Sequence, residues 1–227
     1  MNPTTRIVGC VRLALLTSSG ISHAQNWADN LYLHADIGPA FVQSAPTRTR
    51  NVTESNLGGF ATVQRGRFES DTEIRADLSV GYNLTKSFAL EAEAGAIWNP
   101  TDKSDSYFYQ IPVMLNGIYQ IPLSDSWKVY VGAGAGAVIS RIHGFNRDEA
   151  FHTPITVDDS DWSAGYQAEA GIKYAVSRHV DIDLGYKFLG VAQYNYRFRH
   201  VGDIIQQDIT VNDLFTHSVQ LSLTLRF

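Results

Sequence analysis

Strict alternation of apolar and polar residues ends the sequence and constrains the fold more than any other feature. Between Phe215 and Phe227, every second residue is apolar, and only His217 interrupts the series. Successive side chains of a β-strand point to opposite faces, so one face of this segment is apolar and the other carries hydroxyl, amide and guanidinium groups. A two-faced strand that ends the sequence on an aromatic residue is typical of a membrane-spanning β-barrel.

Seven earlier segments alternate in the same way, which brings the number of predicted strands to eight. They are Leu31–Phe41, Glu73–Leu84, Phe88–Trp98, Tyr107–Gln120, Trp127–Ile139, Trp162–Tyr174 and Val180–Phe188. Short turns, such as Thr85–Ser87 and Pro122–Ser126, alternate with long connections. The long connections are Gln43–Phe68, Asn99–Asp105, Ser140–Ser160 and Gly190–Asn212. Outer-membrane barrels have short periplasmic turns and long extracellular loops. The sequence therefore predicts an all-β fold, an eight-stranded antiparallel up-and-down transmembrane β-barrel.

Aromatic residues gather at both ends of the apolar faces, with Ala, Val, Leu and Ile between them. At the outer end these are Trp98, Tyr107, Tyr109, Trp162, Tyr186, Phe188 and Phe215, and at the periplasmic end Tyr82, Phe88, Tyr119, Trp127, Tyr174 and Phe227. Two aromatic girdles around an apolar band are typical of barrels in lipid.

The first 24 residues have the pattern of a signal peptide. Arg6 and Arg12 give the segment a basic start, and a short apolar stretch runs from Val11 to Leu16. Ser22-His23-Ala24 then predicts cleavage after Ala24. A lipoprotein signal at Cys10 is a weaker alternative, because the apolar stretch follows that cysteine. The predicted domains are thus a signal peptide, 1–24, and a barrel, 25–227. Cys10 is the only cysteine, so the mature chain would have no disulfide.

Composition excludes some classes of protein. No run of about 20 apolar residues follows the signal peptide, so strands would have to cross the membrane. Cleavage changes 18 basic and 23 acidic residues to 16 and 23, a net charge of -7. A chain this acidic is not expected to bind nucleic acid.

The chain resembles the small eight-stranded outer-membrane barrels that include the opacity-type surface antigens and the barrel of outer-membrane protein A. The resemblance lies in the segment Leu31–Phe41 after the signal peptide, the alternating strands and the ending Leu225-Arg226-Phe227. It implies an integral protein in the outer membrane of a Gram-negative-type bacterium. It also implies a non-enzymatic surface protein that stabilises the envelope or binds partners (adhesion) through its extracellular loops. Phe227 would form part of the signal that the barrel assembly machinery recognises. Unlike outer-membrane protein A, the chain is expected to have no peptidoglycan-binding domain after the last strand, so we do not expect it to be tethered to the cell wall.

The polar faces of the predicted strands would point into the lumen and carry both signs of charge. The residues expected in an ion-pair network are Asp36, Arg75, Asp77, Glu91, Glu93, Lys128, Glu169, Lys173, Asp181, Asp183, Lys187 and Arg226. Eight strands leave room only for side chains, so we expect this network to fill the lumen. The alternative is a narrow, gated path for ions or small solutes. Gly132, Gly134 and Gly136 leave space that Met114 and Gln167 would fill.

Arginines lie where the long loops meet the outer rim of the barrel, where their guanidinium groups would bind lipopolysaccharide phosphates. They are Arg65, Arg67, Arg141, Arg197 and Arg199. The alternation in the fourth long connection predicts a projecting hairpin that exposes Tyr194, Tyr196 and Phe198 to an extracellular protein or glycan partner. The alternative is a hairpin with a purely structural role. Asp158, Asp159 and Asp161 would hold a cation or, as the blander alternative, remain solvated.

Enzymatic function has little support in the sequence, although a lipid-modifying enzyme is an alternative. His217 and Ser218 are adjacent strand residues on opposite faces, so they cannot form a base and nucleophile pair. His152 with Ser160 and Asp161 matches no motif, and the carboxylate pairs Glu91/Glu93 and Asp181/Asp183 would face a sealed lumen. The glycines from Gly132 to Gly136 lack the following helix that a dinucleotide site needs. We therefore expect no catalytic residue, cofactor or metal.

Overall fold

The computed structural model describes residues 29–53, 60–68, 72–98, 107–147, 154–200 and 205–227. The predicted signal peptide, its cleavage site and His152 lie outside these ranges. Within them every regular element is a β-strand. No helix of the described chain has the length and apolar character needed to cross a membrane.

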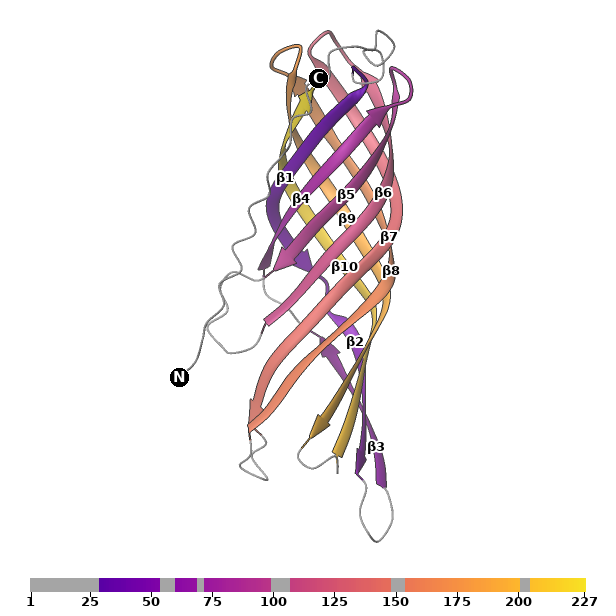
Figure 1. The fold of residues 1–227 in the computed structure, drawn as a ribbon, viewed down its shortest axis with the longest axis vertical. Coiled ribbons are helices and arrows are strands. Elements are labelled where there is room, and N and C mark those ends of the chain that lie inside the picture. The colour runs from indigo at the N-terminus through magenta and orange to yellow at the C-terminus, as the bar shows by residue number, and fades with distance from the viewer. Residues whose placement is uncertain (1–28, 54–59, 69–71, 99–106, 148–153, 201–204) are drawn as a thin grey trace, which may run out of the picture.

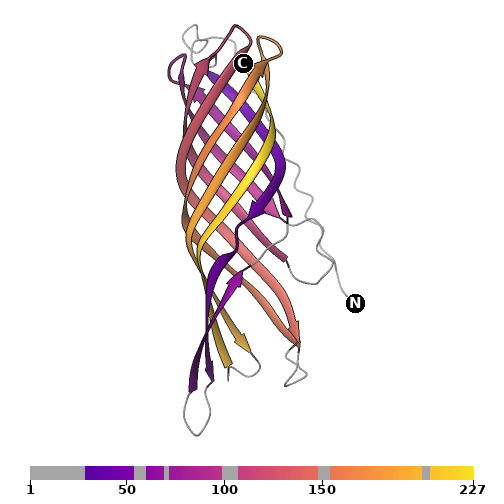
Figure 2. The ribbon, with the colours of Figure 1, turned by 180° about the vertical axis from the view of Figure 1, so that it is seen from behind.

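The strands form an antiparallel sheet in which eight members close a ring (Figures 1 and 2). The strands are β1 (Leu31–Val42), β2 (Ala45–Thr53), β3 (Phe60–Phe68), β4 (Thr72–Asn83), β5 (Phe88–Trp98), β6 (Tyr107–Pro122), β7 (Trp127–Arg147), β8 (Pro154–Ala175), β9 (Val180–His200) and β10 (Ile205–Arg226). The ring runs from β1 through β4 and on in sequence order to β10, which pairs back with β1. The prediction of an up-and-down barrel is confirmed.

Three short turns join the strands at the end where β10 finishes, the upper end in Figure 1. Each begins with a hydroxyl residue, Thr85, Ser124 or Ser177, whose side-chain oxygen accepts hydrogen bonds from backbone N–H groups two and three residues later. Thr and Ser favour such turns because their side chains replace a backbone acceptor. One local motif therefore closes every described turn at this end.

The barrel has the inverted polarity of a protein in lipid. The outward residues are apolar and exposed, as at Leu115 (60%) and Leu221 (63%), whereas the alternating inward residues are polar and buried. Aromatic side chains meet at both ends of the apolar band. The rings of Trp127 and Tyr174 lie 4.7 Å apart near the turns, and those of Phe188 and Phe215 lie 5.6 Å apart near the opposite end.

The strands are longer than predicted, because hairpin partners stay paired beyond the membrane band. β7 and β8 remain paired to Arg147 and Pro154, and β9 and β10 to His200 and Ile205. The segment Ser140–Ser160, predicted as a loop, is thus largely β-ribbon, and the hairpin predicted within Gly190–Asn212 is confirmed. Pairing between β8 and β9 stops at Gly165 and Val191, so the two ribbons separate there.

The first long connection, predicted as a loop, contains the hairpin β2–β3. β2 pairs with the outer part of β10, which adds two strands to the eight of the ring and makes a four-stranded external sheet in the order β9-β10-β2-β3 (Figure 2). The sequence did not predict this hairpin because Thr47–Asn51 alternates Thr or Asn with Arg and has no apolar face.

The inward face changes parity near Asp213. Leu189 and Val191 point inward from β9, but farther from the turns Tyr194 and Tyr196 do so. Asp213 has a φ of 52°, the left-handed region, and lies where this change occurs. The expectation that the hairpin exposes its tyrosines is therefore wrong: Tyr194 is 0% and Tyr196 2% exposed. The side chain of Phe198 lies outside the described part.

Candidate functional site

The middle of the lumen holds two cations and three carboxylates, and both cations contact two of these carboxylates. Lys187 Nζ lies 2.8 Å from Asp36 Oδ2, 3.1 Å from Asp77 Oδ2 and 2.8 Å from Glu93 Oε2. Arg75 donates to Asp77 Oδ2 at 2.7 Å and to Glu93 Oε1 at 3.0 Å. Strands β1, β4, β5 and β9 each supply one or more of these residues, so the network ties distant walls of the barrel together.

Amides complete this central layer. Gln167 accepts a hydrogen bond of 2.6 Å from Arg75 and donates one to Glu93. Asn116 also donates a hydrogen bond to Glu93. Gln220 donates to Asp77 at 3.0 Å. Buried carboxylates with several donors remain charged at lower cost than isolated ones, so the layer is a cross-linked polar plug.

A second layer lies toward the turns and is built around tyrosines. Tyr32 donates to Glu91 at 2.6 Å and Tyr130 to Asp183 at 3.0 Å. Lys173 Nζ lies 3.8 Å from Asp183 Oδ2 and 5.5 Å from the centre of the Tyr130 ring. The phenol hydroxyls therefore hold two of the carboxylates that the sequence placed in the lumen.

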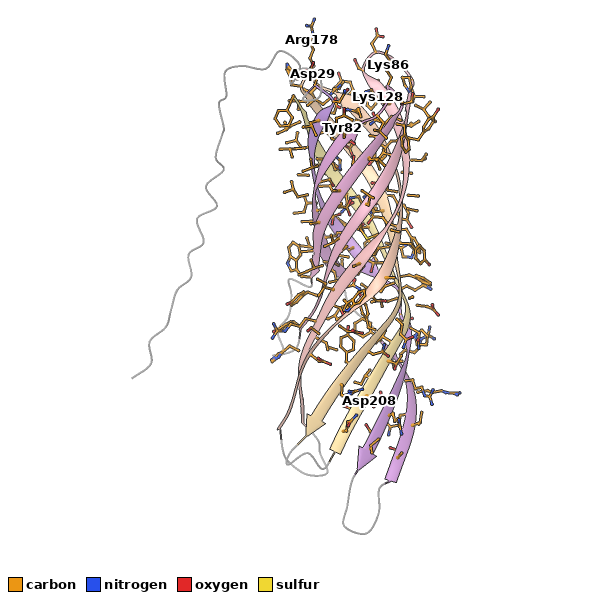
Figure 3. All side chains as sticks on the ribbon, turned by 45° about the vertical axis from the view of Figure 1, so that its right-hand side comes forward. Asp29, Tyr82, Lys86, Lys128, Arg178 and Asp208 are labelled. Atoms are coloured by element: carbon orange, nitrogen blue, oxygen red, sulfur yellow. The ribbon has the colours of Figure 1, made fainter. Side chains whose placement is uncertain are left out.

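The remaining lumen residues are less completely paired. Arg226 pairs with Asp181 at the turn end. Oε1 of buried Glu169 has no hydrogen-bond partner among the described residues. Lys128 is half-buried at the same end as Arg226, where it lines a cavity of about 480 Å³ together with Lys86. Figure 3 shows Lys128, Lys86 and Tyr82 at this end of the molecule. All twelve residues of the expected network thus face the lumen or its mouth, and ten of them are at most 7% exposed.

An apolar cluster fills the outer part of the lumen. Its members are Ala40, Ala45, Ile97, Met114, Val138, Leu189, Val191, Tyr194, Tyr196, Val211 and Leu214. Ser140 Oγ and the Tyr196 hydroxyl are joined by a hydrogen bond of 2.6 Å, and Gln110 donates to the Tyr194 hydroxyl at 3.1 Å. Burial raises the pKa of Tyr196, so its hydroxyl stays neutral. The lumen is therefore occupied by side chains at three successive levels.

The glycines of β7 give the network its space. A Cβ on Gly134 would overlap Asn116 Oδ1, and one on Gly132 would lie 2.7 Å from Glu169 Cγ and 2.6 Å from Ile118 Cδ1. The neighbours that occupy this space are thus Asn116, Glu169 and Ile118, not the side chains of Met114 and Gln167 as predicted. β7 continues as a strand through this segment, so the glycines belong to a wall and not to a dinucleotide-binding turn.

Two aspartates bridge the gap where β8 and β9 separate. Asp161 Oδ2 accepts a hydrogen bond of 2.6 Å from the backbone N–H of Asn195, and Asp159 Oδ2 accepts one of 2.7 Å from that of Arg197. These carboxylates cap the edge of β9 in place of a neighbouring strand. The side chain of Asp158 lies outside the described part, and the described residues contain no group of side chains suited to a metal.

The external sheet gathers arginines on one face. Arg48 lies directly opposite Arg65 on β3 and Thr210 on β10, and Arg50 lies opposite Asp208, which in turn lies opposite Arg197. Directly opposed residues of antiparallel strands share a face. Arg67, two residues from Arg65, shares it too. Figure 3 shows Asp208 on this sheet, at the end of the molecule opposite Lys86 and Arg178.

The five rim arginines of the sequence prediction therefore separate. Arg65, Arg67 and Arg197 lie on this face, Arg141 lies on β7 opposite Tyr109 and Ser160, and the side chain of Arg199 is outside the described part. Sequence reasoning missed Arg48 and Arg50. Their spacing of two residues, repeated in Arg65 and Arg67, was the available signal.

The residues considered for catalysis do not meet. His217 Nδ1 shares a hydrogen bond of 2.6 Å with the Tyr186 hydroxyl and lies against the Phe188 ring on the outer surface. Ser218 points inward and donates to the Lys187 carbonyl at 3.4 Å. His217 is therefore an interfacial side chain paired to the aromatic girdle.

A closed antiparallel ring with an apolar outer surface, aromatic ends and a charged interior defines the class of transmembrane β-barrels. The family model described as the outer membrane protein beta-barrel domain matches residues 13–227, and the chain belongs to this family. It is thus an integral outer-membrane protein. No curated protein sequence matches the chain.

Solved structures share the fold at low sequence identity. The outer membrane protein OprG from Pseudomonas aeruginosa has a TM-score of 0.56 at 14% identity, over 86% of this chain and 96% of that chain. Neisserial surface protein A has a TM-score of 0.49 at 17% identity, over 87% and 97%. The outer membrane protease OmpT from Escherichia coli has a TM-score of 0.48 at 10% identity, over 86% and 97%.

Proposed function

We propose that this chain is a non-enzymatic surface barrel that binds extracellular partners through its external sheet and ribbons, while its barrel stabilises the outer membrane. One observation carries the proposal: side chains occupy the lumen at three levels, whereas the sheet β9-β10-β2-β3 stands outside the ring. Groups that a partner can reach are therefore on the external strands. Binding residues are commonly carried by such projecting segments on a rigid scaffold.

A passive lumen follows from the same observation. Conduction would require Lys187 and Arg75 to leave three carboxylates together, and breaking buried ion pairs costs about 3–5 kcal/mol. In planar bilayers we expect no steady conductance. Steady single-channel currents would instead favour the small-solute channel.

Lipopolysaccharide in the same membrane is a further proposed partner. Arg65, Arg67 and Arg197 lie together with Arg48 and Arg50, and guanidinium groups bind phosphate through paired hydrogen bonds. If replacing these five arginines with glutamine leaves co-purified lipopolysaccharide unchanged, this part of the proposal fails.

The adhesion proposal is tested by removing the peripheral hairpin. Ala45 lies opposite Phe68, so residues 46–67 can be replaced with Asn-Gly, which favours a two-residue hairpin turn. We expect bacteria producing this variant to lose attachment to cultured cells and protein-coated surfaces while the barrel stays heat-modifiable.

A second variant shortens the ribbon formed by β7 and β8. Phe145 lies opposite Thr156, so residues 146–155 can be replaced by the same turn. Unchanged attachment in both variants, each with an intact barrel, would overturn the proposal of binding through these ribbons.

A further inference from the structure

β3 is the free edge of the external sheet among the described residues. One side of β3 pairs with β2 from Phe60 to Phe68, and no described strand pairs with its other side (Figure 1). Residues 61–67 are all exposed. An unpaired edge presents backbone N–H and C=O groups that can pair with another strand.

The arginine face makes this edge selective. Arg48 and Arg65 are directly opposed, and like charges in this position destabilise a sheet. Asp208, the single acid on the face among the described residues, already accepts a hydrogen bond of 3.2 Å from Arg197 Nε. Arg48, Arg50 and Arg65 have no carboxylate partner among the described residues.

A groove of about 560 Å³ runs along the same face. Arg48, Arg50 and Arg197 line it together with Thr210 of β10. Within the described part of the chain, the arginine face therefore combines open space with more basic than acidic side chains, and it reaches the edge of the sheet at Arg65 and Arg67.

We propose that β3 accepts an eleventh strand, an extended acidic segment of another protein with carboxylates at alternate positions. This inference rests on the proposed surface-binding function and names the chemistry of its partner. Two carboxylates spaced by one residue would lie opposite Arg65 and Arg67, and the backbone of the segment would pair with the edge of β3.

The β3 edge of a second copy of this chain does not supply that chemistry. β3 contains no Asp or Glu, so pairing two β3 edges would bring only further positive charge. An antiparallel pair would also keep the faces aligned and place the arginines of the two copies against one another.

Synthetic peptides test the proposal against the full chain in lipid nanodiscs. The probe is a fluorescent nine-residue peptide in which Glu and Thr alternate. The comparison peptide has the same composition but carries all its Glu residues consecutively. We expect the alternating peptide to bind, and the double variant R65E/R67E to bind it about tenfold or more weakly, since it replaces two attractive charge pairs with two repulsive ones. R178E, in a turn at the opposite end, should bind as the wild type does.

Backbone methylation separates strand pairing from simple charge attraction. Methylating every second amide blocks one edge of the peptide, so methylation of the odd and of the even amides should have unequal effects on affinity. The strand proposal would be overturned if both methylated peptides bound with equal affinity and dextran sulfate bound as well as the alternating peptide does. The face would then be a general anion-binding site. Attachment lost on deleting residues 46–67 but kept in R65E/R67E would refute this inference while leaving the proposed function standing.

Discussion

Lys187 Nζ lies 2.8 Å from Asp36 Oδ2, and this ion pair joins β9 to β1 across the intervening strand β10. Asp36 and Lys187 are 151 residues apart in sequence. The same ammonium group contacts Asp77 and Glu93. One side chain thus links four strands of the ring and holds the centre of the lumen closed.

Replacing Lys187 with Met should strongly destabilise the barrel. The change removes the ammonium group that three buried carboxylates share and leaves Arg75 against Asp77 and Glu93, and His34 Nε2 3.3 Å from Asp36 Oδ2. Loss of one partner of a buried pair costs about 3–5 kcal/mol. Urea unfolding in detergent, followed by loss of heat-modifiability, measures this loss. Lys86 in an exposed turn provides the control, and K86M should change stability by about 0.5 kcal/mol or less. Equal unfolding midpoints for K187M and wild type would contradict the network.

Adding a methyl group at Gly134 should also destabilise the chain. Its Cβ would overlap Asn116 Oδ1 and lie 2.6 Å from the Leu115 carbonyl oxygen, and overpacking typically costs about 1–3 kcal/mol. In contrast, a Cβ on Gly66 would meet only Thr47 Oγ1 at 3.0 Å, so G66A should be neutral or slightly stabilising. Thermal unfolding of both variants measures the difference, and a G134A barrel as stable as wild type would show that the wall has free space.

Truncating Asp161 should loosen the external ribbons without weakening the ring. D161A removes the acceptor of the Asn195 N–H, and hydrogen bonds to charged groups contribute about 1.5–3 kcal/mol. Hydrogen exchange at Asn195 should therefore accelerate about tenfold or more, with the barrel midpoint nearly unchanged. Asp125, in an exposed turn at the other end, serves as control; equal exchange in D161A and D125A would refute the capping role.

The backbone conformation of Asp213 predicts that two substitutions there change the stability of the barrel in opposite directions. Its φ of 52° is readily adopted by Gly but disfavoured for β-branched residues. D213G should be neutral or up to about 1 kcal/mol more stable, whereas D213V should lose about 1–3 kcal/mol. Denaturant midpoints distinguish these outcomes, and equal stability of the two variants would mean that the backbone there is not constrained.

Deleting Phe227 should impair assembly more than stability. The ring of Phe227 is exposed (61%), and its backbone N–H donates to the Leu31 carbonyl at a long 3.4 Å, so few contacts are lost from the folded barrel. The measurement compares heat-modifiable protein in outer-membrane fractions with the urea midpoint of barrel refolded in detergent. F88L removes an aromatic ring from the same girdle without changing the terminus. If F88L reduces insertion as much as the deletion does, Phe227 is not a specific assembly signal.

The sequence by itself determined the ring of eight strands and the residues on each of its faces. A strand has a period of two, and a barrel in lipid must be apolar outside, so residues such as Leu221 and Gln220 could be assigned to opposite faces without coordinates. The lumen charges follow from the same alternation. The pairing of particular carboxylates with particular cations does not follow from the alternation, because it depends on the register between strands that are distant in sequence.

Outside the membrane, the sequence predicted the hairpin of β9 and β10, but only the tertiary structure decided how the other strands pair with it. There, alternation no longer separates lipid from lumen, and β2 and β3 carry no apolar face that would mark them as strands. β10 provides the edge on which Thr47–Thr53 pairs, and Tyr194 and Tyr196 point inward beyond the position at which Asp213 has a positive φ. The arginine face exists because four strands that are not all adjacent in sequence pair in one register, and local propensity contains no information about that pairing.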